Sequence, residues 1–554
     1  MQRPNGERTL DSTPAAGPDW TWRATLAVGV LLTVGVVALH FVYYWHAGPL
    51  WRDEAGTAGF SAMPYGEIVA KRHYDAFPVA FTLIVHTWIA AGLGGTDAGL
   101  RQLGMLMGLA GVAALWWSGR RLRLAAPLVA LLLFGMNPSR IIWGDSVRGY
   151  GLAIFAVLWC IGALWAFVER PTWRTYAIAQ LAALLTVQSH YGNTALLAGM
   201  CAGAAAVCLR RRAWRSLALT MAIGGVAAIA VMINVAGMTS SHGFAMAATD
   251  TGDFSLGWYL GVFWRALTSG TPLLGFLWVG AAGLAAAGGL VAARSGSRSA
   301  AASKDLVLYV VTAVAVSTVV LFAVAWGVVK LPSQVWHYLP LMALIGLASD
   351  VGIGMLASRF RRGGVVRLAV VAVAAVLVAR DVAATVSVRM TNIDLSARWI
   401  EAAGRAEDLI VVYPWFCSVS FDRYYRGPAP WITVPDVVDR RYHPLLEVAE
   451  KIKLGDAGFA AELERVEGVL RAGGRVWIVG GLLAPPPGQP APHLPPAPNG
   501  PWGWQSAPYI TGWLTQLGAL MQAHARTLQK IELPPTGSVN DLENAPLLVA
   551  EGWH

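Results

Sequence analysis

Two adjacent carboxylates, Asp53 and Glu54, follow the first long apolar run of this 554-residue sequence. A carboxylate at such a place can take a proton from a hydroxyl group, and its neighbour could hold a substrate or a divalent metal ion. The structural alternative is that both acids begin a helix, where the helix dipole favours negative charge. The dipeptide alone leaves both interpretations open.

Cationic residues that could bind a phosphate stand at two later places. Arg148 closes the stretch NPSRIIWGDSVR (137–148), and a guanidinium there could hold a phosphate with two hydrogen bonds. Its alternatives are extension to the membrane interface or an ion pair with Asp145. Lys330 and His337 bracket a second polar stretch and could contact a phosphate as well. That stretch could instead serve as an interfacial aromatic anchor.

Three further residues are weaker candidates for the same site. His190 and Tyr191 stand at a short turn between two apolar runs, and Arg265 stands in the stretch FWRAL. A single histidine at a turn of this kind is more often structural than catalytic. We therefore expect these residues to line a substrate cavity at most.

The composition defines the environment in which these residues must be placed. Hydrophobic residues make up 56% of the chain and charged residues 13%, against about 25% charged in soluble domains. These values exclude a soluble enzyme, a disordered protein and a coiled coil. Four cysteines exclude a disulfide-stapled scaffold and show no metal-ligand spacing. The net charge of +10 suggests nucleic-acid binding, but the basic residues form short clusters between apolar runs, which is typical of a membrane protein.

Eleven apolar runs are long enough to be read as membrane spans. A bilayer core of about 30 Å needs about 20 apolar residues in a helix. The runs lie at 24–45, 101–119, 125–143, 150–168, 175–189, 192–208, 216–236, 271–293, 306–329, 338–357 and 366–386.

The orientation depends on one ambiguous segment, residues 77–93. If this segment does not cross the bilayer, every basic cluster falls on the same side, which the positive-inside rule assigns to the cytoplasm. We therefore expect 77–93 to form an interfacial or re-entrant helix. The predicted organisation is a cytoplasmic segment 1–23, a transmembrane domain 24–387 with an outer loop 46–100 that carries the carboxylate pair, and an extracytoplasmic domain 388–554.

The C-terminal part predicts a small soluble α/β domain. Residues 408–414 and 475–480 are short apolar runs typical of buried strands, and 441–471 has helical spacing of its apolar positions. The proline-rich stretch 485–501 predicts no regular structure. We find no glycine-rich nucleotide-binding motif and no internal repeat.

The order of these features resembles the integral-membrane glycosyltransferases of the GT-C superfamily. The resemblance covers roughly residues 20–425 and is strongest to the bacterial protein-mannosyltransferase and aminoarabinose-transferase-like branch. It rests on the carboxylate pair after the first span, an apolar interfacial helix, and the stretches NPSRIIWGDSVRGY, QSHYG, VWHYLPL and DLIVVYPW. The fold that it implies is a polytopic α-helical membrane domain followed by a soluble domain.

The resemblance implies a sugar donor linked through phosphate to a polyprenyl lipid, with transfer at the outer face of the cytoplasmic membrane. The acceptor would be a hydroxyl of a glycan, a lipid or a protein. By resemblance, Asp53 would be the general base and Glu54 its neighbour in the motif. Arg148 matches the family's arginine after the third span, and His190 and His337 match positions that line the cavity.

The sequence also departs from the family pattern. Many relatives carry a His-Pro-Pro-Leu-like start to the interfacial helix, where this chain has DAFP (75–78). His73, two positions before Asp75, is a further candidate for the substrate cavity. Relatives often have Arg-Tyr where His337 and Tyr338 stand. A divalent metal ion would take Asp53 and Glu54 as ligands, but no third ligand can be identified. The departures from the family pattern leave the identity of the sugar and of the acceptor open.

Two other classes of function remain possible from the sequence. A transporter or flippase for lipid-linked sugars would show charged residues at mid-membrane depth and repeat symmetry. A non-enzymatic membrane scaffold would leave the carboxylate pair as helix caps and Arg148 as an interfacial anchor.

Overall fold

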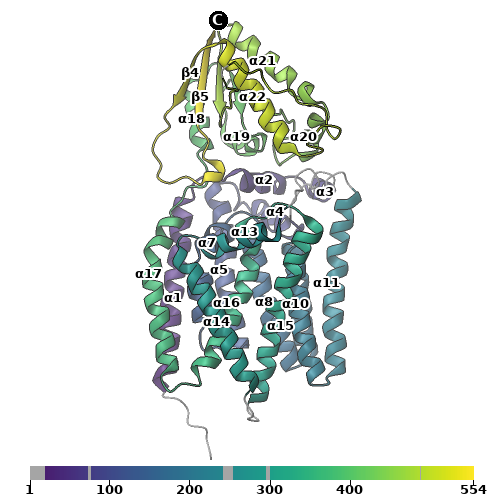
Figure 1. The fold of residues 1–554 in the computed structure, drawn as a ribbon, viewed down its shortest axis with the longest axis vertical. Coiled ribbons are helices and arrows are strands. Elements are labelled where there is room, and N and C mark those ends of the chain that lie inside the picture. The colour runs from purple at the N-terminus through teal and green to yellow at the C-terminus, as the bar shows by residue number, and fades with distance from the viewer. Residues whose placement is uncertain (1–18, 73–76, 241–253, 295–299, 487) are drawn as a thin grey trace, which may run out of the picture.

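The computed structural model describes residues 19–72, 77–240, 254–294, 300–486 and 488–554. A bundle of long helices carries an α/β domain at one end, and the short helices of the bundle lie between the two parts (Figure 1). The long helices are α1 (Asp19–His46), α5 (Asp97–Arg121), α8 (Tyr150–Glu169), α9 (Trp173–Ser189), α10 (Asn193–Arg210), α11 (Trp214–Ser240), α14 (Pro272–Arg294), α15 (Ala300–Val324), α16 (Leu339–Ala357) and α17 (Gly363–Val386).

Eight helices among the described residues are long and apolar enough to cross a membrane, so the predicted count of eleven spans is not confirmed. The predicted spans 125–143, 175–189 and 366–386 are not among the eight. The first of these is broken into α6 (Leu128–Ala130), the π-helical turn η2 (Leu131–Gly135) and α7 (Pro138–Gly144). The break falls before Pro138, which lacks the N–H that a continuous helix needs. The other two form the 17-residue α9 and the 24-residue α17.

The ambiguous segment 77–93 forms the 11-residue helix α4 (Ala80–Ala90). At 1.5 Å per residue such a helix is about 17 Å long, well short of a bilayer core of about 30 Å. Helix α4 is therefore too short to cross a bilayer core by itself. Helices α2 (Arg52–Ser61), α3 (Tyr65–Lys71), α4 and α13 (Leu256–Leu267) all lie at the end of the bundle that faces the C-terminal domain (Figure 1).

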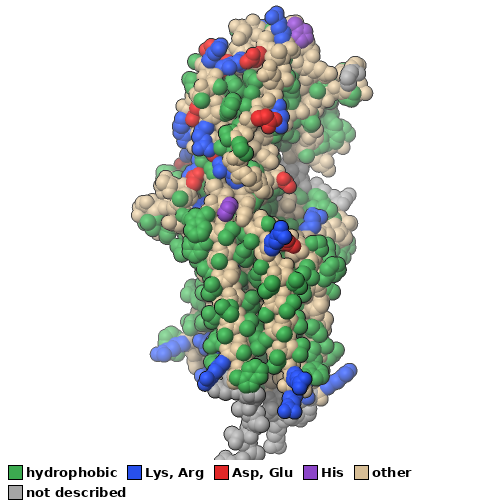
Figure 2. Space-filling view, turned by 90° about the vertical axis from the view of Figure 1, so that its left-hand side faces the viewer, with side chains coloured by type: hydrophobic (Ala, Val, Ile, Leu, Met, Phe, Trp, Pro, Cys, Tyr) green, Lys and Arg blue, Asp and Glu red, His purple; other side chains and the backbone are tan. Residues whose placement is uncertain are grey.

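The surface of the bundle is suited to lipid. Hydrophobic side chains cover its length, whereas Lys and Arg side chains gather at its lower end and over the C-terminal domain (Figure 2). Large apolar side chains such as Leu31, Val319 and Val376 are more than half exposed. Water would penalise so wide an apolar surface, but the hydrocarbon core of a bilayer does not. The chain is therefore a multi-pass helical membrane protein.

The C-terminal domain contains a five-stranded sheet in the order β2-β1-β3-β5-β4. Strand β1 pairs in parallel with β2 and β3, while β5 pairs antiparallel with β3 and β4. The predicted strands at 408–414 and 475–480 are confirmed as β1 and β3. The elements are β1 (Leu409–Val412), β2 (Trp431–Thr433), β3 (Arg475–Val479), β4 (Ala525–Ile531) and β5 (Leu547–Trp553), with α18 (Ile393–Ala403), α19 (Ser418–Tyr424), α20 (Leu445–Ile452), α21 (Ala460–Arg471) and α22 (Ser506–His524).

Candidate active site

Helix α2 places the two adjacent carboxylates in different surroundings. Consecutive residues of an α-helix are about 100° apart around its axis, so they do not share a face. Asp53 keeps 24% of its side chain exposed, whereas the side chain of Glu54 is fully buried. The pair therefore cannot act as two equivalent acids at one surface.

Glu54 forms a buried ion pair with Arg101 of α5. The guanidinium donates to both carboxylate oxygens, at 2.9 and 2.8 Å, and the backbone N–H of Val147 donates to Oε1 at 3.0 Å. Arg101 also donates to the carbonyl oxygens of Gly48 and Pro49, at 2.7 Å each. Glu54 thus joins α2, α5 and the segment after α7, and this engagement favours a structural role over the predicted catalytic one.

Asp53 is surrounded by positive or protonatable groups. Its Oδ1 lies 3.7 Å from Nε of Arg52 and 3.6 Å from Nε2 of His443, which belongs to the C-terminal domain. Burial alone would raise the pKa of Asp53, but the interaction with His443 and the positive charges of Arg148 and Arg52 outweigh it. The pKa of Asp53 is lowered as a result, and the carboxylate stays ionised.

Arg148 lies beside Asp53 and contacts Thr57, which is one helical turn further along α2. Its Nη1 donates to the Thr57 hydroxyl at 2.9 Å and approaches the carbonyl oxygen of Asp53 at 3.5 Å. The guanidinium also lies over the ring of Phe77, 4.7 Å from its centroid, in a cation–π contact. The structure therefore brings the predicted base and the predicted phosphate-binding arginine together.

The alternative pairing of Arg148 with Asp145 is not formed. Asp145 instead contacts Nδ1 of the buried His40 in α1, at 2.5 Å. Arg140 contacts the other ring nitrogen of His40 and donates to the carbonyl oxygen of Gly108 at 2.7 Å. A Cβ on Gly108 would lie 1.8 Å from the Asp145 carboxylate, so glycine is needed at that position. This network fixes the segment that leads into Arg148.

Aromatic and histidine rings continue from Arg148 into the bundle. Phe77 is 4.9 Å from Tyr150 and 5.5 Å from His190, between ring centroids, and His190 is 6.0 Å from His337. Burial and the charge of Arg148 lower the pKa of His190 to about 4, so its imidazole is neutral at neutral pH. The two predicted histidines thus lie together and next to Arg148.

The other predicted residues that the structure describes differ in their exposure. Lys330 is exposed at the end of the π-helical turn Ala325–Val329, and Arg265 is exposed on α13. Tyr191 is half-buried at the turn after α9. His73 lies outside the described residues.

His443, which was not predicted as a site residue, reaches Asp53 from the loop before α20. Both of its ring nitrogens are buried without a hydrogen-bond partner among the described residues. Its imidazole lies nearly perpendicular to the Trp415 ring, with 5.9 Å between ring centroids. No local motif marks this histidine, because its neighbours at the site are distant in the sequence.

Several contacts hold the loop of His443 on α2 and α3. The preceding Tyr442 packs edge-on against Phe60 of α2, with 5.9 Å between ring centroids. Arg441 pairs with Glu67 at 3.0 Å. A Cβ on Gly59 would lie 2.3 Å from the carbonyl oxygen of Arg441, so the loop backbone lies directly against α2. The position of His443 is therefore defined by the docking of the whole domain.

The described residues do not offer a metal site. They contain no group of three His, Cys, Asp or Glu side chains that could hold an ion. Of the two predicted ligands, Glu54 has both oxygens engaged by Arg101, and Asp53 has Arg52 and Arg148 as cationic neighbours. This donor set does not fit a divalent cation.

No protein-family model and no curated protein matches the sequence. The fold is similar to solved structures of ArnT from Cupriavidus metallidurans bound to undecaprenyl phosphate (14% identity, 81% of this chain and 92% of that chain, TM-score 0.46). It is also similar to the Archaeoglobus fulgidus oligosaccharyltransferase in complex with Zn and sulfate (11% identity, 82% and 68%, TM-score 0.47). A third is the archaeal oligosaccharyltransferase AglB from the same organism with an inhibitory peptide and a dolichol-phosphate (11% identity, 83% and 69%, TM-score 0.47). Similarity of this degree concerns the fold alone.

Proposed function

We propose that this chain is a glycosyltransferase that moves a sugar from a polyprenyl-phosphate donor to an acceptor hydroxyl. The proposal rests on one observation, which is that Asp53 and Arg148 lie side by side. Asp53 belongs to α2, at the end of the apolar helical bundle that faces the C-terminal domain (Figure 1). A lipid-linked donor would reach these groups from the bilayer, and an acceptor would reach them from the aqueous side.

Asp53 is the proposed base. The acceptor oxygen attacks the anomeric carbon of the sugar, and the bond from that carbon to the phosphate oxygen breaks with both electrons on the departing polyprenyl phosphate. The proton of the acceptor hydroxyl passes to Asp53. A carboxylate with a lowered pKa is always ionised but is a weak base, and His443 at 3.6 Å can share the proton that it receives.

Arg148 is the proposed partner of the leaving phosphate. A fixed cation stabilises the negative charge that develops as the glycosidic bond breaks. Its contacts with Thr57 and Phe77 hold it in place beside the base. The neutral His190, together with His337 and Tyr150, would offer ring faces and hydrogen-bonding nitrogens to the sugar.

An activity assay tests this proposal directly. Purified protein in lipid nanodiscs is incubated with a radiolabelled polyprenyl-phosphate sugar and membrane extract as acceptor. We expect label to move to the acceptor, and Asp53→Asn to reduce transfer by about a hundredfold or more. Asp381→Asn is the matched control, since Asp381 is an exposed acid on α17. In sealed vesicles that contain the same protein, label that crosses the bilayer still attached to its lipid would indicate transport instead.

The proposed orientation has its own test. We propose that the C-terminal domain is extracytoplasmic and the opposite end of the bundle cytoplasmic, as the basic clusters predict. All four native cysteines are buried, so single cysteines introduced at Ala213 and Arg398 can be labelled selectively. A membrane-impermeant reagent should label position 398 and spare position 213 in sealed cells. Labelling of both positions from outside would contradict the arrangement.

A further inference from the structure

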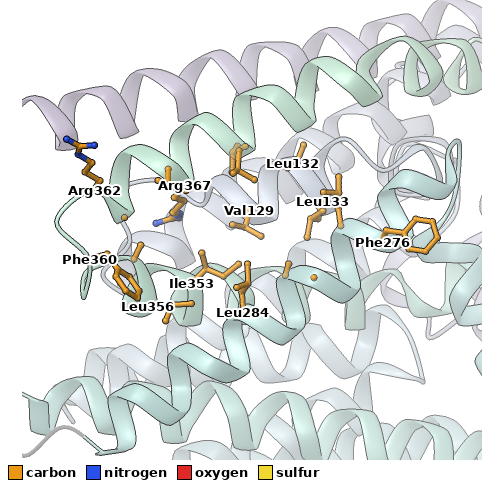
Figure 3. A pocket seen from close by; sticks show the side chains of 18 residues that line it. Val129, Leu132, Leu133, Phe276, Leu284, Ile353, Leu356, Phe360, Arg362 and Arg367 are labelled. Atoms are coloured by element: carbon orange, nitrogen blue, oxygen red, sulfur yellow. The ribbon is translucent and has the colours of Figure 1, made fainter.

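A second feature of the bundle lies away from the proposed active site. An open cavity of about 550 Å³ is lined by α14, α16, α17 and the broken span at α6 and η2 (Figure 3). Apart from Arg362 and Arg367, its lining is apolar and includes Leu133, Leu284 and Ile353. A volume of this size is within the range of pockets that hold small ligands.

The packing of the helices explains the cavity. Helices α14 and α16 are in close contact, since a Cβ on Gly288 would lie 2.0 Å from the carbonyl oxygen of Gly352. Helix α17 is connected to α16 by the ion pair of Arg367 with Asp350. The broken span closes one side only partly, because α6 has three residues before the π-helical turn.

Arg367 is the unusual residue of this cavity. Its side chain is 15% exposed and extends from α17 towards the cavity (Figure 3). Asp350, which it contacts, also accepts from the backbone N–H of Ala130 at 2.8 Å. The Nε of Arg367 is buried and has no hydrogen-bond partner among the described residues. An unmet buried donor of this kind is costly, and the ion pair with Asp350 balances the charge of Arg367 inside the bundle.

Arg362 marks the end of the cavity at the membrane surface. It lies in the exposed turn between α16 and α17, at the end of the bundle opposite the C-terminal domain, and Figure 3 shows it at one end of the cavity. Arg359 and Arg361 are exposed in the same turn. The cavity therefore combines a cationic end at the surface with an apolar body at bilayer depth.

We propose that this cavity binds an anionic glycerophospholipid from the leaflet at that end of the bundle. Basic pockets between transmembrane helices are suited to anionic headgroups, and the apolar body matches an acyl chain. The phosphate would lie at the surface end of the cavity and accept hydrogen bonds from the exposed guanidinium of Arg362. The polyprenyl-phosphate donor is a different ligand, since its phosphate must reach Arg148 at the other end of the bundle.

The test uses glycines as matched positions on one helix. Gly280 lines the cavity and Gly283 does not, and a Cβ at either would meet nothing within 4 Å. The leucine side chain of Gly280→Leu should therefore occupy the cavity, and that of Gly283→Leu should lie outside it. Neither side chain should clash with its neighbours. Arg362→Gln removes the proposed headgroup contact, and Arg361→Gln is its control.

The measurement is native mass spectrometry of protein released from vesicles of phosphatidylcholine with a minority of phosphatidylglycerol. We expect the wild-type protein to retain phosphatidylglycerol preferentially. Gly280→Leu and Arg362→Gln should reduce its retention several-fold, and both controls should behave as wild type. Equal retention of the two lipids, or equal retention by Gly280→Leu and Gly283→Leu, would overturn the proposal. Displacement of phosphatidylglycerol by added polyprenyl phosphate would assign the cavity to that lipid instead.

Discussion

The opposite surroundings of Asp53 and Glu54 lead to opposite effects of two closely matched substitutions. Asp53→Asn and Glu54→Gln each replace a carboxylate by an amide of the same shape at adjacent positions. Asp53 is partly exposed and makes loose contacts, whereas Glu54 is fully buried and bonded by Arg101. We expect Asp53→Asn to reduce transfer by about a hundredfold or more with little change in stability, and Glu54→Gln to destabilise the protein.

The magnitude for Glu54 follows from its contacts. The carboxylate accepts two charge-assisted hydrogen bonds from Arg101 and one from the N–H of Val147. Removal of one partner from a buried ion pair leaves the other charge uncompensated and typically costs about 3–5 kcal/mol. The Gln amide retains one acceptor oxygen, so the loss for Glu54→Gln should lie near the lower end of that range. Glu54→Leu should cost more.

The assay is unfolding of the purified proteins in detergent, followed by circular dichroism, with the transfer assay run on the same samples. The double variant Glu54→Leu/Arg101→Met should be more stable than Glu54→Leu, because it removes the orphaned guanidinium. The reasoning would be refuted if Glu54→Gln kept wild-type stability and lost transfer, since Glu54 would then act in catalysis. Strong destabilisation by Asp53→Asn would refute it as well.

The remaining predictions concern the other groups around Asp53. His443→Ala should lower the transfer rate several-fold, with His493→Ala, an exposed histidine of the same domain, as the unaffected control. The same His443→Ala change should shift the acid limb of the pH–rate profile to higher pH, because the contact with His443 lowers the pKa of Asp53; a shift to lower pH would contradict this assignment. Arg148→Gln should reduce transfer by about a hundredfold, and Arg148→Lys should recover part of the rate; a wild-type rate in Arg148→Gln would remove Arg148 from the mechanism.

Features that depend on the local sequence could be predicted well. A run of about 20 apolar residues with few charges identifies a membrane helix whatever surrounds it, and most of the predicted runs form long helices. The strands β1 and β3 were also found from short apolar runs. The broken span at 125–143 shows the limit, because hydropathy measures the length of an apolar run and not the continuity of the helix within it.

The candidate site was only partly predictable. Asp53 and Arg148 stood out because charged residues at the ends of apolar runs are few, and the structure places them together. His443 gave no signal, since its importance comes from a domain that docks on α2 from the far end of the chain. The roles of Asp53 and Glu54 could not be separated, because the sequence contains no sign that Arg101, 47 residues away from Glu54, would pair with it.

The sequence by itself determined that this chain is a helical membrane protein, that an α/β domain follows its helices, and that an acid and an arginine stand next to apolar runs. Hydrophobicity decides these properties, and it acts on each segment separately. Only the tertiary structure decided which of two neighbouring acids is buried, which histidine faces the other acid, and where helices leave a cavity. Those outcomes depend on packing and charge pairing between segments that are remote in the sequence, and both act only at short distances in the folded protein.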